Sequence, residues 1–294
     1  MRYEGTVYRP PSEGDSVIIQ ATVGCPHNRC RFCRLYKRKK FRIRPVADIL
    51  EDIATAGEYY PPAYVRTVFL ADGNTVVMRT AQLLEILARI REVFPRVERV
   101  TSYGAAQYFT RKSPQEWREL REAGLSRIHC GMETGHDPLL ALTNKGCTKA
   151  VYIDGCRRVR DAGIELSMYY LTGLGGTALW REHALDSAAV LNAVNPEFIR
   201  IRTFTPMPGT PMGDEFLAGT FGLPEPHAAL RELRLLVENL DVTSRFYSDH
   251  WLNFADIHGI LPNDKNRMLA AIDKALTLPR SAFREVGILP KDSL

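Results

Sequence analysis

Short apolar, strand-like runs alternate with helix-like segments along most of this sequence, and this alternation constrains the fold more than any other feature. The expected strands cover residues 17–22, 67–70, 99–102, 127–130, 164–171 and 198–202. Strands that are separated by single helices pair in parallel, because each helix runs back along the sheet and the next strand begins at the same end as the one before. The pattern therefore predicts an α/β protein, either a partial barrel or a doubly wound sheet.

The expected helices fill the intervals between these strands. They cover residues 45–56, 80–94, 114–123, 149–162 and 179–193. The clearest begins after Ser113, which serves as N-cap, with Pro114 in the first turn, Glu116 completing a capping box and Gly124 ending the helix. The alternation stops near residue 240, and a strand at 241–247 and a helix at 265–276 are expected beyond it. We predict a core over residues 1–240, with a short N-terminal extension, and an appendage over 241–294 that packs on it.

Charge and hydropathy exclude some classes of protein. The 294 residues contain no run of 18 apolar residues, so a membrane-spanning helix is not expected. No apolar segment follows the first five residues, so we expect a cytoplasmic protein without a secretory signal. The net charge of +5 fits an anionic ligand or nucleic acid, although many enzymes carry a similar excess.

Three of the six cysteines form a cluster directly after the first expected strand. Cys25, Cys30 and Cys33 have the spacing C-x4-C-x2-C, and thiolates this close can share one metal centre. Three kinds of metal site compete: zinc with His27 as a further ligand, a 2Fe–2S cluster that needs a distant fourth cysteine such as Cys130, and a 4Fe–4S cluster with one open iron. Unliganded thiols are the remaining alternative.

The other three cysteines are scattered. Cys130, Cys147 and Cys156 are expected to be buried small hydrophobic side chains, and Cys156 shares a helical face with Tyr152 and Val159. A second cluster or a hydrogen-donating thiol is the alternative role for these cysteines.

The segment from Cys25 to Cys33, with Phe32 before the last cysteine, resembles the cluster loop of radical S-adenosylmethionine (SAM) enzymes. It is most similar to the subgroup that contains coproporphyrinogen dehydrogenases, methylthiotransferases and elongator-type proteins. The usual spacing in that family is C-x3-C-x2-C, so this chain has one extra residue. The resemblance covers about residues 15–240 and implies a partial (β/α)6 TIM-like barrel with a C-terminal α/β appendage. It also implies a 4Fe–4S cluster on these three cysteines, SAM as cofactor, and Phe32 near the adenine.

The resemblance extends to motifs at the ends of later strands, where barrel enzymes place their active sites. It implies cofactor contacts from three segments: Asp72, Gly73 and Asn74 toward the methionine amino group, Glu133 and Lys145 toward the polar end of the cofactor, and Thr172, Gly173 and Leu174 toward the adenine. Without the resemblance, Asp72-Gly73 would be interpreted as a turn and the Glu–Lys pair as a surface ion pair.

The implied reaction is reductive cleavage of SAM to a 5′-deoxyadenosyl radical, which removes hydrogen from a substrate. A reductant such as flavodoxin or ferredoxin is then required. We expect a small-molecule substrate and do not favour nucleic acid; the positive net charge is compatible with an anionic substrate. The alternatives are an RNA-modifying radical SAM enzyme and a non-catalytic iron–sulfur or haem-carrying protein. A basic run follows the cluster and is expected to form a solvated loop, although it could also attract an anion: Arg34, Lys37, Arg38, Lys39, Lys40, Arg42 and Arg44.

The appendage contains a second group of polar and aromatic residues, Asp249, His250 and Trp251. A six-strand barrel leaves an opening, and radical chemistry has to be shielded from water. We therefore predict that this segment closes the barrel mouth, with His250 exchanging a proton near neutral pH and Asp249 orienting it. A structural His–Asp pair is the alternative.

Overall fold

The computed structural model describes residues 1–287 and divides into two compact units. The first unit contains Met1–Asn28, Leu35–Cys130 and Asp154–Leu166. The second contains Arg29–Arg34, Gly131–Ile153 and Ser167–Leu294.

The first unit is built on parallel strands, in the order β1 (Val17–Gln20), β4 (Thr67–Ala71), β5 (Arg99–Gly104) and β6 (Leu125–Glu133). The last three residues of β6 fall in the second unit. The strand expected at 17–22 is in fact split, because Thr22–Val23 (β2) leaves β1 and pairs with β3 (Arg42–Ile43). The Arg44 guanidinium fixes the break by donating to the Gln20 carbonyl at 2.6 Å.

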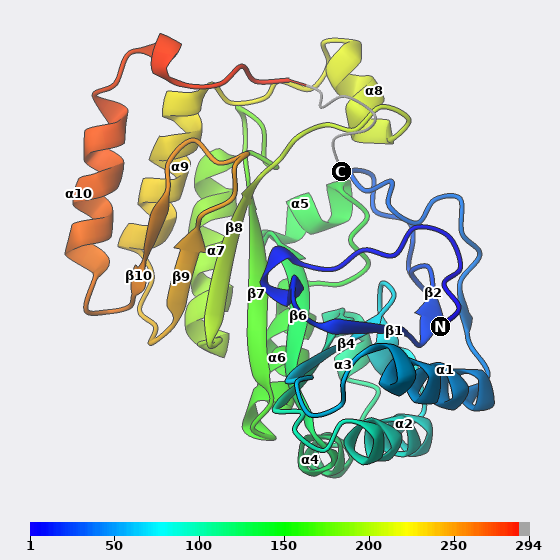
Figure 1. The fold of residues 1–294 in the computed structure, drawn as a ribbon. Helices are drawn as coiled ribbons and strands as arrows, with labels where there is room; N and C mark the ends of the chain where they lie inside the picture. Colours follow the sequence, from blue (N-terminus) through cyan, green and yellow to red (C-terminus); the bar gives the residue numbers. More distant parts are fainter. Residues whose placement is uncertain (288–294) are drawn as a thin grey trace. The chain divides into compact units, whose positions relative to one another are not determined.

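The helices of the first unit follow the predicted pattern closely (Figure 1). They are α1 (Val46–Tyr59), α2 (Thr80–Val93), α3 (Ala106–Phe109), α4 (Pro114–Ala123) and most of α6 (Lys149–Asp161), with 3-10 turns at Pro11–Glu13 and Thr75–Val77. The predicted start of α4 is confirmed, since Ser113 Oγ accepts from Glu116 N and Glu116 Oε2 accepts from Ser113 N. Gly124 ends α4 with a φ of 112°, which favours glycine. The short helix α3 was not predicted.

The second unit contains most of β7 (Glu165–Thr172), whose first two residues fall in the first unit, followed by β8 (Phe198–Thr203), β9 (Arg245–Ser248) and β10 (Ile257–Ile260) in that order. The strands β7, β8 and β9 are parallel and β10 is antiparallel to β9. The expected strand at 241–247 begins later, at Arg245, and β10 was missed because its four residues include a glycine and give only a weak strand signal. The mixed α/β class is confirmed, whereas the domain limits at residue 240 remain a prediction.

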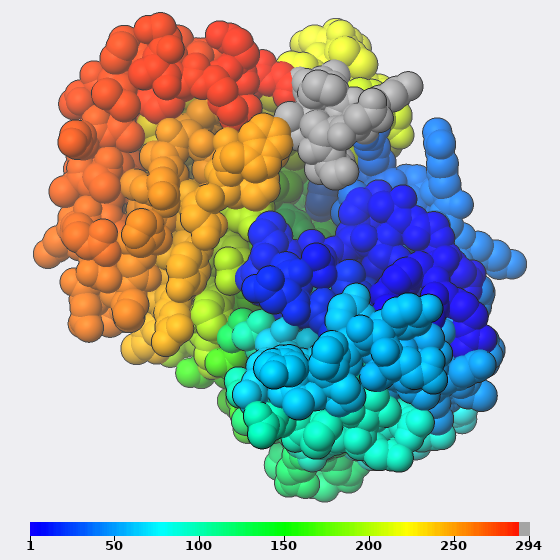
Figure 2. Space-filling view, viewed as in Figure 1, coloured from blue at the N-terminus to red at the C-terminus, as the bar shows by residue number. Residues whose placement is uncertain are grey.

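The helices of the second unit are α5 (Asp137–Leu142), α7 (Trp180–Val194), α8 (Pro211–Leu217), α9 (Pro226–Glu238) and α10 (Lys265–Leu276), with a 3-10 turn at Arg280–Ala282. The helix α9 packs against both α7 and α10 (Figure 1). Figure 2 shows α10 and the residues after it, in orange to red, at the surface of this unit. Within residues 1–287, no helix has the length and apolarity needed to cross a membrane.

Candidate active site

The cysteine loop begins after β2, and its residues divide between the two units. Cys25 belongs to the first unit, and Cys30 and Cys33 belong to the second. All three are half-buried, and none of the six cysteines, which all lie in the described part of the chain, forms a disulfide. In the second unit, Arg31 anchors the loop by donating its N–H to the Thr143 carbonyl at 2.9 Å. The tight turn from Cys30 to Cys33 is therefore fixed by backbone contacts.

In the first unit, Asp72 holds the backbone that leads into Cys25. Asp72 is fully buried, and its Oδ2 accepts from Gly24 N at 3.1 Å and lies 3.2 Å from Lys39 Nζ. Gly73 donates to the Gly24 carbonyl at 3.1 Å. A Cβ on Gly73 would lie 3.1 Å from the Cys25 Cβ, so the close approach of the two loops favours glycine at this position.

The next residue, Asn74, is a buried polar side chain without a partner. Its side chain is fully buried, and neither amide atom has a hydrogen-bond partner among the described residues. An unsatisfied buried amide costs about 1–3 kcal/mol, so such groups usually meet a ligand or water. Asn74 is therefore well suited to bind a polar group of a cofactor.

In the second unit, the structure brings together Glu133, Lys145 and Phe32. Lys145 Nζ lies 3.3 Å from Glu133 Oε1 and 5.7 Å from the centroid of the Phe32 ring. Glu133 has a φ of 65° at the end of β6, a strained conformation that is found preferentially at functional sites. The ion pair is largely shielded from solvent, so it is stronger than a surface pair.

The turn after β7 contains Thr172, Gly173 and Leu174. Leu174 is fully buried and belongs to an apolar cluster against which Phe32 packs, so two residues expected near the adenine share one environment. Thr172 Oγ1 is buried and has no hydrogen-bond partner among residues 1–287. The turn thus presents one unsatisfied hydroxyl beside an apolar surface.

A buried carboxyl that the sequence analysis missed holds this turn in place. Glu232 of α9 accepts from Gly173 N at 2.9 Å and from the Tyr170 hydroxyl at 2.7 Å, both at Oε1. Burial raises the pKa of Glu232 to about 8, so the carboxyl is protonated at neutral pH. The sequence offers only a weak signal for this role, a glutamate on the apolar face of a helix between Leu230 and Leu233.

His183 extends the same network. Its ring stacks on Tyr170 with the centroids 4.5 Å apart, Nδ1 lies 2.8 Å from Thr134 Oγ1 and Nε2 lies 3.2 Å from the Leu171 carbonyl. A neutral ring with its proton on Nε2 satisfies both contacts. Burial lowers the pKa of His183 to about 3, which agrees with that neutral form.

The predicted lid residues follow β9. Asp249 Oδ1 lies 3.9 Å from Arg202 Nη1, and Trp251 is 62% exposed. His250 accepts from Leu252 N at 3.3 Å, and burial, aided by the positive charge of Arg202, lowers its pKa to about 4. The ring is therefore neutral at pH 7 and acts there as a hydrogen-bonding group. Coverage of a substrate by this segment remains a prediction.

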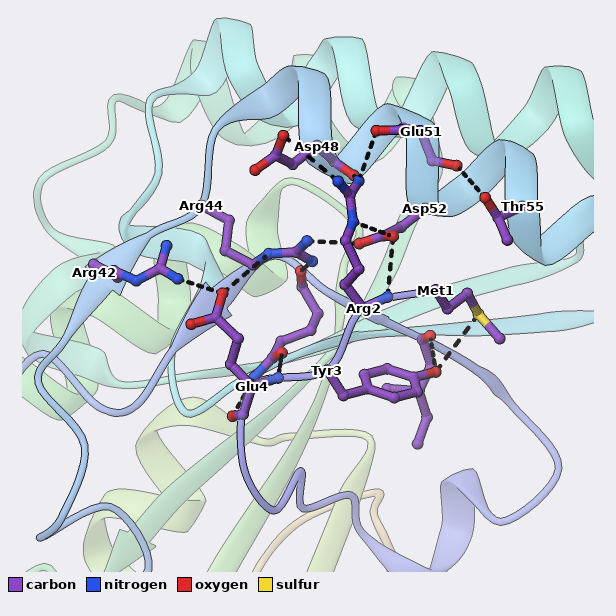
Figure 3. A network of polar contacts seen from close by, with 12 residues as sticks. Met1, Arg2, Tyr3, Glu4, Arg42, Arg44, Asp48, Glu51, Asp52 and Thr55 are labelled. Atoms are coloured by element: carbon purple, nitrogen blue, oxygen red, sulfur yellow. Dashed lines mark hydrogen bonds and ion pairs between the residues drawn. The ribbon is translucent and has the colours of Figure 1, made fainter.

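The basic run after the cluster is only partly solvated, which corrects the expectation of a solvated loop (Figure 3). Arg44 is 2% exposed and its Nη2 lies 2.6 Å from Asp52 Oδ2. Arg42 forms an ion pair with Glu4, and Lys39 is paired with Asp72. Buried acids explain the difference, because Asp52 of α1 and Asp72 draw Arg44 and Lys39 into the fold, whereas Arg42 stays exposed beside Glu4. The expectation holds for the exposed Lys37, Arg38 and Lys40.

The remaining cysteines separate into two kinds. Cys130 and Cys156 are fully buried, as predicted, and so are Tyr152 and Val159. Cys147 is half-buried, so its prediction was wrong. It lies between α5 and α6 in a turn that contains Gly146 with a φ of 79°, and this turn does not belong to the buried face of either helix.

Comparison with known proteins identifies the family. The family model described as the Radical SAM superfamily matches residues 19–188, so the chain belongs to this superfamily of enzymes. Its members use a 4Fe–4S cluster and SAM. The three half-buried thiols have the donor chemistry that an iron–sulfur cluster takes, but residues 1–287 contain no group of three metal-ligating side chains gathered within reach of one metal ion, so the cluster ligands remain a prediction from their spacing. The unpartnered amide of Asn74 fits a polar group of the cofactor.

Individual relatives place the chain among enzymes with different substrates. It is 25% identical over 214 residues to a tRNA-2-methylthio-N(6)-dimethylallyladenosine synthase of Alkalilimnicola ehrlichii, covering 69% of this chain and 46% of that protein. It is 26% identical over 211 residues to a biotin synthase of Parafrankia, covering 70% of this chain and 54% of that protein. The chain thus spans about half the length of these relatives.

Solved structures support the barrel-like fold. Methylornithine synthase matches with a TM-score of 0.54 at 18% identity, over 95% of this chain and 76% of that one. Coproporphyrinogen III oxidase from Escherichia coli, a radical SAM enzyme, matches with a TM-score of 0.54 at 16% identity, over 76% of this chain and 51% of that one. The predicted TIM-like barrel class is confirmed by these neighbours.

Proposed function

We propose that Cys25, Cys30 and Cys33 hold the 4Fe–4S cluster and that the enzyme acts on a small molecule. When bound, the cluster and SAM supply the one-electron chemistry that removes a hydrogen atom from the substrate. Binding and water exclusion are the tasks of the protein. The spacing of the three cysteines and the anchoring of the loop at Arg31 support the assignment of the ligands.

The remaining site residues are proposed to bind and orient SAM. Lys145 and Glu133 offer opposite charges to its carboxylate and amino groups, and Asn74 offers an unpaired amide. The turn at Gly173, held by the buried Glu232, is proposed to contact the adenine beside Phe32. Asp72 and Gly73 are proposed to act mainly by fixing the backbone before Cys25. Asp72 accepts a hydrogen bond from Gly24 N, and Gly73 donates one to the Gly24 carbonyl.

The observation that favours a small substrate is a polar, enclosed face on the strands of the second unit. Tyr170 points to α7 and α9, because it stacks on His183 and donates to Glu232. Side chains alternate along strands, so Ser167 and Tyr169 of β7 lie on the opposite face, together with Arg200, their neighbour on β8. Ser167 is fully buried and Arg200 is 9% exposed, so this polar face suits a small ligand better than a polynucleotide.

A second observation weighs against RNA as substrate. Three cations of the run after the cluster, Lys39, Arg42 and Arg44, already form ion pairs with carboxylates of the protein. Nucleic-acid affinity depends on cations that can neutralise phosphates, so these pairs reduce the basic surface that remains for RNA.

The test measures 5′-deoxyadenosine from the reconstituted enzyme, reduced chemically or with flavodoxin or ferredoxin. Cellular metabolites that pass an ultrafiltration membrane are compared with purified total tRNA. We expect the metabolite fraction to stimulate 5′-deoxyadenosine formation and tRNA to leave it unchanged. Stimulation by tRNA alone, with binding that weakens steeply as salt rises, would instead establish an RNA-modifying enzyme.

A further inference from the structure

Arg200 is a buried cation in the centre of the polar face described above. Its Nε donates to Ser167 Oγ at 3.2 Å, and the guanidinium carbon lies 5.0 Å from the ring centroid of Tyr247 and 5.9 Å from that of Phe198. The side chain therefore lies between aromatic rings on β8 and β9. Its Nη1 and Nη2 have no hydrogen-bond partner among the described residues.

The charge of Arg200 is not balanced by any carboxylate in the described part of the chain. Within residues 1–287 Arg200 forms no ion pair with a carboxylate, although the residue is buried, with only 9% of its surface exposed. Arg202 adds a second cation on the same face, where it lies 5.5 Å from the ring centroid of Tyr169, and Asp249 lies 3.9 Å from it. Arg200 itself thus carries one positive charge that no carboxylate among residues 1–287 balances. Buried charges are normally paired, so this surplus points to an anionic ligand.

We propose that Arg200 binds a carboxylate group of the small-molecule substrate. The planar edge of a guanidinium matches the two oxygens of a carboxylate, and the Nε contact to Ser167 fixes the plane of the group. A single surplus charge suits a monocarboxylate better than a phosphate dianion. The aromatic rings of Tyr247 and Tyr169 provide an apolar wall for the body of such an acid. This proposal rests on the small-molecule function proposed above.

The direct test uses acetate as the minimal carboxylate probe and detects its binding by saturation-transfer NMR. We expect acetate to bind the wild type, to lose its signal in Arg200→Gln and to bind about tenfold more weakly in Arg200→Lys, which keeps the charge but loses the planar fork. Arg245→Gln is the matched control, because Arg245 lies exposed on β9 near the same Phe198 ring, and should bind acetate normally. Circular dichroism verifies that each variant is folded.

Three results would overturn the proposal. These are acetate binding to folded Arg200→Gln at the wild-type level, tighter binding of inorganic phosphate than of acetate, and weakened SAM binding in Arg200→Gln, which would assign the residue to the cofactor. The carboxylate proposal and the small-molecule function can fail independently of each other. If metabolites stimulate the wild type and Arg200→Gln equally, the carboxylate proposal fails while the small-molecule function stands, and stimulation by tRNA alone removes the function itself.

Discussion

Replacing Glu232 by glutamine should remove a pH dependence from the stability of the protein. Burial raises the pKa of this carboxyl from 4.5 to about 8. Between these pH values the folded state holds the proton and the unfolded chain has released it, so raising the pH favours unfolding. The stabilising effect of the protonated carboxyl is therefore complete below pH 4.5 and is lost as the pH rises through 8.

The size of the effect follows from one proton. The free energy of unfolding should fall by about 1.4 kcal/mol per pH unit within this range, or roughly 5 kcal/mol in total. Glu232→Gln is neutral at every pH and keeps an oxygen that can accept from Tyr170 and Gly173. The two proteins should be similar near pH 5, and the glutamine variant should become progressively more stable than the wild type toward pH 8.

The assay is urea unfolding of both proteins at a series of pH values between 5 and 8, under reducing conditions. The difference between their free energies of unfolding isolates the titration of Glu232 from that of all other groups. If the difference stays constant over this range, Glu232 is ionised in the folded protein, and the neutral network with His183 and Tyr170 is wrong.

Three further predictions concern the cofactor and the lid. Lys145→Ala should weaken SAM binding about tenfold by calorimetry, while Lys149→Ala, which removes a lysine paired with another acid, should not, and equal affinities for both variants would remove the role of Lys145. Asn74→Ala should weaken SAM binding without lowering the melting temperature of the cofactor-free protein, since it deletes an unsatisfied amide, and a large loss of stability would mean that the amide is structural. His250→Ala should retain iron and SAM binding but cleave SAM without converting substrate, and conversion at the wild-type rate would refute the lid.

Local signals in the sequence account for much of the fold. The capping box at Ser113 and Glu116 defines the start of α4, and the apolar period of residues 265–276 defines α10, so both could be predicted. The short strand β10 could not, because a strand of four residues depends on its partner β9 for stability. Tertiary pairing likewise overrode the local pattern at Thr22, where β2 turns away to β3.

In the candidate site too, some residues could be predicted from local sequence signals and others depend on tertiary contacts. The spacing of the three cysteines and the position of Lys145 relative to Glu133 are visible in the sequence. The roles of Glu232 and Arg200 are not, because each depends on partners about 30 to 60 residues away and on burial that no local pattern encodes. A polar residue inside an apolar helix face or strand is the one signal that marks such positions.

Iron content and 5′-deoxyadenosine formation, measured together on the wild type and on single-cysteine variants, test the proposed cluster site most directly. Anaerobic reconstitution should give about four irons per chain for the wild type, with 5′-deoxyadenosine formed on reduction. Alanine variants of Cys25, Cys30 and Cys33 should lose the iron and the product, and those of Cys130 and Cys156 should keep both. A folded Cys30→Ala protein that retains four irons and forms 5′-deoxyadenosine at the wild-type rate would contradict the assignment.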